Sequence, residues 1–327
     1  MMSVSKKLIG GEQDIISNRL FYGVTNSGRS SLRWILHSMS LKGKRIMLPD
    51  FLCQVIVDVV KEFNIDIVFY KINIDLSYDF LDKVETVDAV YIIKFFGDDS
   101  ASFIKSISAT KSKLIIDDVF GTDSPISILS NHWCYFNSLR KISYVADYSQ
   151  VVSNKTLTNI NKKNLISFSK NKYLAKNEKY NFINGLSVDE SYLSKSQAAE
   201  TLLDASKGIY QPSDTSLYYT IKFYQSIREE TSARLLNLNI AKETLKDGSY
   251  LNINPSFPSF LPVILHNRDE VRKALFVDNI YLATHWPATE DSNNELSHKL
   301  LSIPLDSRYS VDDIKLICDL VNKYSSE

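Results

Sequence analysis

The alternation of short apolar runs with longer amphipathic stretches between Val24 and Asp123 constrains the fold more than any other feature of this chain. Strands buried between two layers of helices are continuous apolar runs, and parallel neighbours need a crossover helix between them. The pattern therefore predicts βαβ units and a mostly parallel sheet. The expected strands are 43–49, 66–72, 89–96 and 113–117, and the expected helices are 28–39 and 53–63.

The chain changes character twice after this region. From 157 to about 180 it is rich in Lys, Asn and Ser with weak periodicity, so we expect an exposed connection or structure of low stability. Two long helices, 194–203 and 218–245, then lead to a compact α+β unit. That unit is expected to contain strands 260–265 and 280–283 and helices 269–276 and 311–324. We predict a large α/β domain over 1–205, and a linker helix with a small C-terminal domain over 206–327.

Charge and composition exclude several classes of protein. Lys plus Arg and Asp plus Glu are each 38, so no bulk charge attracts nucleic acid or an anionic membrane. No apolar run approaches the roughly 20 residues that a bilayer span needs. The first residues carry two lysines without a following apolar core, which argues against a secretory signal. Three widely spaced cysteines argue against a disulfide framework. These features predict a cytoplasmic protein with reduced thiols.

One turn and two acidic pairs are candidate binding elements. The turn 26–31 (NSGRSS) places hydroxyls, backbone N–H groups and Gly28 at a helix N-terminus, where a phosphate could bind, although an ordinary Ser-capped helix explains it too. Asp117-Asp118 ends an apolar strand, at the edge where α/β proteins bind ligands, or else caps the next helix. Asp98-Asp99 also follows a strand, so a divalent metal could bind between the two acidic pairs. No His lies nearby in the sequence to support a metal site, and we predict none.

Lys141 is a further candidate, within the segment 136–141 (FNSLRK) that follows a short apolar run. A single lysine in a lysine-rich chain is usually a solvated charge. Lys141 becomes a stronger candidate because it follows the turn and the acidic pair along the chain.

Taken in order, these segments resemble the DegT/StrS-type sugar aminotransferases, fold-type I enzymes that use pyridoxal 5′-phosphate (PLP), and in particular a short, divergent branch of them. The resemblance covers nearly the whole chain. It rests on Gly28-Arg29-x-x-Leu32, Leu48-Pro49-x-Phe51-x-Cys53, Phe95-Phe96-Gly97, Asp117-Asp118, Ser138-Leu139-Arg140-Lys141, and Leu301-Ser302-x-Pro304 with Arg308-Tyr309.

The resemblance implies a role for each matched residue. Lys141 would bind PLP covalently and then transfer the substrate proton. Asp118 would hold the pyridinium proton, with Asp117 as the alternative if the register differs by one. The backbone amides of Gly28, Arg29 and Ser30 and the Ser138 hydroxyl would bind the phosphate. Either Phe51 or Cys53 would cover one face of the ring.

Two positions depart from the family pattern. The family commonly has an aromatic residue where Cys53 aligns. It also has a Gly-Gly turn after the lysine, whereas this chain has Ala146-Asp147-Tyr148-Ser149. A glycine turn adopts positive φ without strain and Tyr148 does not, so the loop must differ.

The resemblance implies a homodimer that transfers an amino group from L-glutamate or glutamine to a keto group of a nucleotide-linked sugar. The product would serve a surface polysaccharide such as O-antigen. Two alternatives stay open: a PLP enzyme acting on another small, phosphorylated ketone, and a non-catalytic descendant that binds a sugar nucleotide or a partner protein. His285-Trp286-Pro287 could line a site or pack the small domain. Arg308 could receive a substrate carboxylate or form a surface ion pair.

Overall fold

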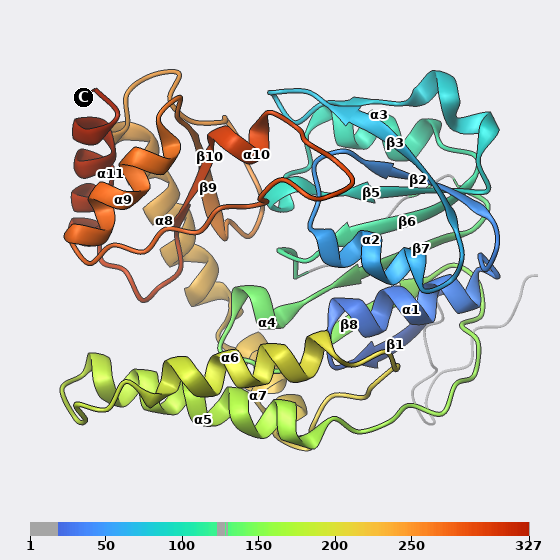
Figure 1. Ribbon diagram of the computed structural model, residues 1–327, viewed down its shortest axis with the longest axis horizontal. Helices are drawn as coiled ribbons and strands as arrows, with labels where there is room; N and C mark the ends of the chain where they lie inside the picture. The colour runs from blue at the N-terminus through green and yellow to red at the C-terminus, as the bar shows by residue number, and fades with distance from the viewer. Residues whose placement is uncertain (1–18, 123–127, 129, 327) are drawn as a thin grey trace, which may run out of the picture.

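The computed structural model describes residues 19–122, 128 and 130–326. The segment read as lacking a secretory signal lies outside the described residues. An eight-stranded sheet forms the centre of the larger part of the molecule (Figure 1), in the order β1-β8-β7-β6-β5-β2-β3-β4. In that order the strands are β1 (Phe21–Thr25), β8 (Ser149–Ser153), β7 (Trp133–Asn137), β6 (Lys113–Asp118), β5 (Ala89–Ile93), β2 (Arg45–Pro49), β3 (Asp66–Ile72) and β4 (Tyr78–Asp79).

The five central strands, from β7 to β3, run parallel. Strand β8 runs antiparallel to β7 and β1, and β4 runs antiparallel to β3 at the other edge. The strand expected over 66–72 is confirmed to the residue, and the other three expected strands are confirmed with shifted ends. The predicted mostly parallel α/β architecture is confirmed.

Helix α1 (Gly28–Ser38) begins where the sequence places it because Ser27, in extended conformation, caps it and accepts the Ser30 N–H. Its apolar stripe, which includes Leu32 and Ile35, is fully buried against β7 and β8. Helix α2 (Gln54–Lys61) packs beside α1. Short elements connect this region: η1 (Leu81–Thr86), η2 (Phe95–Gly97), α3 (Ala101–Ala109) and α4 (Leu139–Ile142).

The C-terminal part, at the upper left of Figure 1, packs helices against a two-stranded antiparallel sheet of β9 (Phe260–Ile264) and β10 (Leu300–Pro304). Its helices are α8 (Ile227–Thr244), α9 (Arg268–Val277), α10 (Leu296–Lys299) and α11 (Val311–Tyr324). Helix α11 has the predicted bounds because Ser310 and Asp313 form a capping box. The strand expected over 280–283 is wrong: this segment contributes one bridge, between Ala283 and Ser302.

Helices α5 (Ile166–Ile183) and α6 (Ser191–Asp204) form a long hairpin at the bottom of Figure 1, followed by α7 (Asp214–Gln225). The prediction of an exposed connection over 157–180 is wrong for most of that range. Helix α5 has no continuous apolar stripe, because it buries only isolated residues such as Phe168 and Ala175. Phe168 packs with Ala199 and Leu203 in a small cluster separate from the main core.

The domain boundary that we expect at residue 205 stays a prediction. In the ranges that the structure describes, no helix combines the length and apolarity needed to cross a membrane.

Candidate active site

The carboxyl ends of β2, β5, β6 and β7 meet at one edge of the sheet, and the sequence-predicted site residues lie just beyond them. In open α/β sheets this is the edge where ligands bind. Strand β1 runs antiparallel to its neighbour, and it leads directly into the N-terminus of α1.

The turn before α1 is built from buried hydroxyl and amide groups. Ser30 Oγ donates to Asn26 Oδ1 over 2.7 Å, and Ser31 Oγ lies 2.7 Å from Ser149 Oγ on β8. The backbone N–H groups of Gly28 and Arg29 have no protein acceptor within the described part of the chain. Two N–H groups at the positive end of a helix dipole are suited to bind an anion.

The space beside Gly28 is narrow. A Cβ atom at Gly28 would lie 3.3 Å from the Phe136 ring and 3.8 Å from Val119 Cγ1, so any larger residue would crowd this corner of the site. Arg29 turns its side chain away to pair with Asp204 at 2.5 Å, which leaves its backbone as the part that faces the turn.

Lys141 lies in the short helix α4, directly after β7. The charge of Arg140 and, second, burial lower the pKa of its ammonium to about 8, although part of the residue is exposed. The amine is close enough to Cys53, His285 and Asp117 for their charges to interact. A lysine with a lowered pKa is partly neutral near neutral pH, which a nucleophilic amine requires.

Asp117 is the carboxylate on the Lys141 side. Its residue pairs in register with Phe136, whose ring packs against Gly28, so Asp117 and Gly28 share one face of the sheet. The Tyr91 hydroxyl donates to Asp117 Oδ2 over 2.5 Å, and the Val119 N–H donates to Oδ1 over 3.1 Å. Burial raises the pKa of Asp117 to about 7, and the Lys141 charge opposes that rise.

Asp118 points to the opposite face, because successive side chains of a strand alternate. Its Oδ2 accepts a bond from the Tyr135 hydroxyl over 3.3 Å and lies 3.6 Å from Lys94 Nζ. Burial raises the pKa of Asp118 to about 6. The structure thus separates the two candidates: Asp117 shares the face of Gly28 and Asp118 lies on the opposite face, and the assignment of Asp118 to the Lys141 site stays a prediction. Sequence alone cannot decide which member of an Asp-Asp pair faces a given side.

Phe51 and Cys53, the two candidates for covering the ring face, have different surroundings. Phe51 is fully buried and packs its ring against Phe95 at 5.5 Å and Trp286 at 5.4 Å. Cys53 is half-buried at the N-terminus of α2 and interacts electrostatically with Lys141. Of these two residues, Cys53 is the one that interacts with the lysine.

The loop after Lys141 differs from a glycine turn in the way the sequence predicts. Asp147 is buried, and its carboxylate accepts hydrogen bonds from the hydroxyls of Ser169, Ser213 and Ser216. Neither Tyr148 nor its neighbours have positive φ. Ser138, at the start of α4, is buried, and its hydroxyl does not cap that helix.

Two contributors to the site were given no role from the sequence, although His285 was considered there in a segment that could line a site or pack the small domain. One is Tyr91, two residues before Ile93, the register partner of Asp117. The other is His285, which packs among the Phe120, Phe260 and Trp286 rings, with Nδ1 3.0 Å from Ser302 Oγ. Burial and the Lys141 charge lower the pKa of His285 to about 4, which keeps it neutral. His285-Trp286 thus packs the junction and also borders the lysine.

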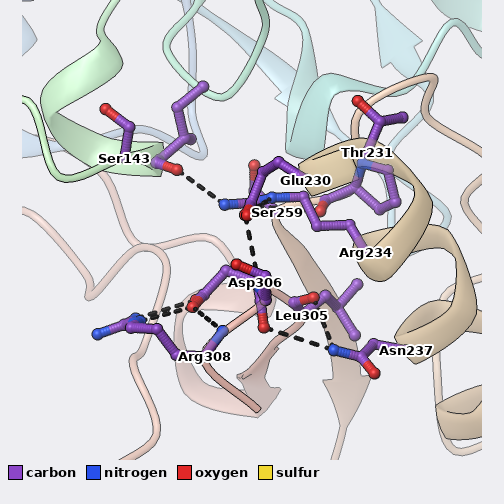
Figure 2. A network of polar contacts seen from close by, with 12 residues as sticks. Ser143, Glu230, Thr231, Arg234, Asn237, Ser259, Leu305, Asp306 and Arg308 are labelled. Carbon is purple, nitrogen blue, oxygen red and sulfur yellow. Dashed lines mark hydrogen bonds and ion pairs between the residues drawn. The ribbon is translucent and has the colours of Figure 1, made fainter. Parts of the chain in front are cut away.

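A buried arginine ties the lysine helix to the C-terminal part (Figure 2). Arg234 on α8 donates to the carbonyl of Ile142, the residue after Lys141, over 2.8 Å and to Glu230 over 2.7 Å. Glu230 in turn accepts the Ser307 N–H over 3.4 Å. Arg308, in the same turn as Ser307, forms a two-pronged ion pair with Asp306, the second of the two roles considered for it.

The second acidic pair, Asp98-Asp99, binds protein groups outside this site. Asp98 accepts the Asn254 N–H over 2.9 Å, and Asp99 pairs with Lys94 at 2.9 Å. Across the described residues, no group of three or more His, Cys, Asp or Glu could hold a metal ion.

No family model and no curated protein matches the sequence. Solved structures do match its fold. DesI, solved in the presence of its TDP-sugar product, has a TM-score of 0.64 and 15% identity, covering 94% of this chain and 81% of DesI. A DegT DnrJ EryC1 StrS aminotransferase from Brucella abortus has a TM-score of 0.62 and 14% identity, covering 94% and 86%. Histidinol-phosphate aminotransferase from Clostridium acetobutylicum has a TM-score of 0.58 and 11% identity, covering 94% and 85%.

The residues present fit PLP on four grounds: a lysine with a lowered pKa, a carboxylate facing it, free N–H groups at the start of α1, and a narrow corner at Gly28. At 11 to 15% identity the comparisons establish architecture. The chain has the fold of the DegT/StrS-type aminotransferases, the fold-type I architecture that its sequence motifs predict.

Proposed function

We propose that this protein is a PLP-dependent aminotransferase. It transfers an amino group from L-glutamate or L-glutamine to a keto group of a nucleotide-linked sugar, in the biosynthesis of a surface glycan such as O-antigen. The observation that carries the proposal is the convergence of Lys141, Asp117 and the start of α1 on one face of the sheet edge. The fold shared with DesI supports the choice of substrate class.

When bound, PLP supplies an electron sink for the charge that develops at the substrate carbon on proton removal. Lys141 attaches the cofactor and then carries the proton, for which its pKa of about 8 is suited near neutral pH. Asp117 holds a proton at the ring nitrogen, with Tyr91 fixing the carboxylate. Asp118, our first sequence-based candidate for that role, becomes a residue of the opposite face.

The remaining residues bind and orient. The N–H groups of Gly28 and Arg29 bind the phosphate with the Ser138 hydroxyl. The Ser30 N–H, which the resemblance also assigns to the phosphate, donates to Ser27 Oγ over 3.4 Å instead, and the Ser30 hydroxyl holds the turn through Asn26. Cys53 would border one face of the ring. Phe51 does not face the ring and packs against Trp286 instead. Neutral His285 and the aromatic side chains around it exclude water from the lysine side.

Assembly and location complete the proposal. We propose a cytoplasmic homodimer, as the family resemblance implies. Large apolar side chains are exposed on helices α5, α7 and α8 and on the connection between α5 and α6, and these surfaces are available for a second copy: Ile166, Ile183, Leu186, Tyr218, Ile221 and Leu236.

The deciding experiment is the absorption spectrum of purified protein with PLP, before and after L-glutamate. We expect visible absorbance from cofactor attached to Lys141, and its replacement by the spectrum of the aminated cofactor when glutamate is added. Wild-type protein that never binds PLP would refute the proposal. Binding without any response to glutamate or glutamine would instead favour a non-catalytic descendant. Turnover with small phosphorylated ketones, and not with nucleotide-linked sugars, would favour the other alternative.

A further inference from the structure

A stripe of lysines on α5 faces the turn that follows Lys141. Lys172, Lys176 and Lys179 are four and three residues apart, so they lie along one face of the helix. Like charges at these spacings destabilise a helix, and Glu178, the nearest acid on α5, pairs with Lys195 instead. The stripe therefore has an electrostatic cost that the helix itself does not offset.

The surroundings of the stripe add positive charge. Lys176 donates to the carbonyl of Ser143, two residues after Lys141, over 3.3 Å. Burial and the charges of Lys172, Arg140, Arg308 and Lys179, in that order, lower the pKa of Lys176 to about 8. The C-terminal part thus contributes Arg308 to the same cluster from across the domain junction.

The nearby carboxylates do not balance this charge. Glu200 pairs with both Arg140 at 2.7 Å and Lys172 at 2.5 Å, and Asp306 pairs with Arg308 at 2.5 Å. In the described part of the chain no carboxylate forms an ion pair with Lys176 or Lys179. Five cationic side chains thus gather around two carboxylates, beside the reactive lysine.

Within the proposed function, we infer that Lys176 and Lys179, with Arg308, form an oxyanion subsite for the diphosphate of the nucleotide-linked sugar. Lys176 contacts Ser143, two residues after Lys141, and Figure 2 shows Ser143 and Arg308 at the same junction. A substrate whose sugar reaches Lys141 would then place its diphosphate against α5. The cations of the cluster outnumber its carboxylates by three, and a diphosphate supplies two negative charges toward that difference; ammonium groups bind phosphate as point charges.

The test uses calorimetric titration of the full-length protein with inorganic pyrophosphate and with UDP and TDP. Replacing both lysines (Lys176→Gln with Lys179→Gln) is expected to weaken binding of each probe by about tenfold or more, and to reduce its salt dependence. The matched control is Lys170→Gln, an exposed lysine on another face of α5. With nucleotide-sugar substrate, KM should rise while kcat is retained.

Three further readouts decide the interpretation. Removing like charges should leave the melting temperature unchanged or raised, so a lowered melting temperature with unchanged probe binding would show a structural role and overturn the inference. Loss of L-glutamate binding, with pyrophosphate binding intact, would assign the cluster to the donor carboxylate and would also overturn it. Wild-type protein that binds PLP and reacts with glutamate, but binds no pyrophosphate, UDP or TDP, would refute the subsite while leaving the proposed function intact.

Discussion

At the end of β6, two consecutive carboxylates point to opposite faces of the sheet and have different surroundings. On the α1 face, Asp117 is held by the Tyr91 hydroxyl and the Val119 N–H and lies within reach of the Lys141 charge. On the other face, Asp118 lies beside Lys94 and Tyr135, and its Oδ1 is buried with no partner among the described residues. Both carboxylates are almost fully buried, so burial does not distinguish them; the direction of each side chain, and the partners it meets there, does.

The largest expected effect is that of Lys141→Ala. Loss of the amine removes both the attachment point and the proton carrier, so amino transfer should fall by about 10⁴-fold or more. Borohydride reduction followed by mass spectrometry should detect cofactor attached to wild-type protein and none on the variant. Lys170→Ala is the control, and cofactor attached at another lysine would contradict the assignment.

Asp117→Asn and Asp118→Asn test the comparison of the two faces directly. Asp117→Asn removes the charge that faces the ring nitrogen, so turnover should fall by about 10²-fold or more. Asp118→Asn should retain most of the turnover and change stability instead, since its partner Lys94 loses a counter-charge. Comparing the turnover of the two variants, both loaded with PLP, shows which carboxylate faces the ring nitrogen. The reverse order of effects would return the role to Asp118.

The raised pKa values of this pair predict a pH dependence of stability. The folded protein keeps protons on Asp117 and Asp118 until about pH 7 and about pH 6, whereas the unfolded chain releases them near 3.8. The stabilisation is complete at acidic pH and is lost as the pH rises through these values. His285 acts in the opposite sense, because its pKa is lowered to about 4.

Urea unfolding of cofactor-free wild-type protein and of Asp117→Asn isolates the Asp117 contribution. Relative to the variant, the wild-type free energy of unfolding should fall by about 2 kcal/mol from about pH 5 to about pH 8. A constant difference across this range would contradict the raised pKa of Asp117.

Arg234→Lys tests the link between the two parts of the molecule. The lysine keeps the charge but cannot bond Ile142, Glu230 and Pro258 together, so the protein should lose about 2 kcal/mol of stability. Hydrogen exchange should increase in α4 more than elsewhere. Arg228→Lys, an exposed arginine of the same helix, should change neither quantity.

The smallest effect is expected at Cys53. Cys53→Ala should lower turnover less than about tenfold, because the thiol lies at the edge of the proposed site and takes no part in the proposed chemistry. Cys53 is also the most accessible of the three thiols, since Cys134 and Cys318 are fully buried. Iodoacetamide should therefore label Cys53, and PLP should slow that labelling. Labelling that PLP does not slow would place Cys53 away from the ring.

The sequence predicted the sheet, α1, α11 and the order of the site residues, because these depend on strong local signals: apolar runs, a capping serine and a capping box. It failed where the deciding contacts are distant in the chain. Helix α5 lacks an apolar stripe and packs on α6, and the direction of Asp117 follows from its register with β5 and β7. Tyr91 reaches Asp117, and His285 reaches the surroundings of the lysine, only through the tertiary fold.

The α5–α6 hairpin has a further consequence. Its own apolar cluster contains only Phe168, Ala199 and Leu203, with Leu165 at its edge, so this pair of helices should open at a lower free energy than the sheet does. The lysines of the inferred subsite are on that hairpin. An anion bound there stabilises the closed form by mass action, so substrate should protect α5 from proteolysis before any chemistry occurs. The sensitivity of this hairpin to proteolysis would thus report whether substrate is present.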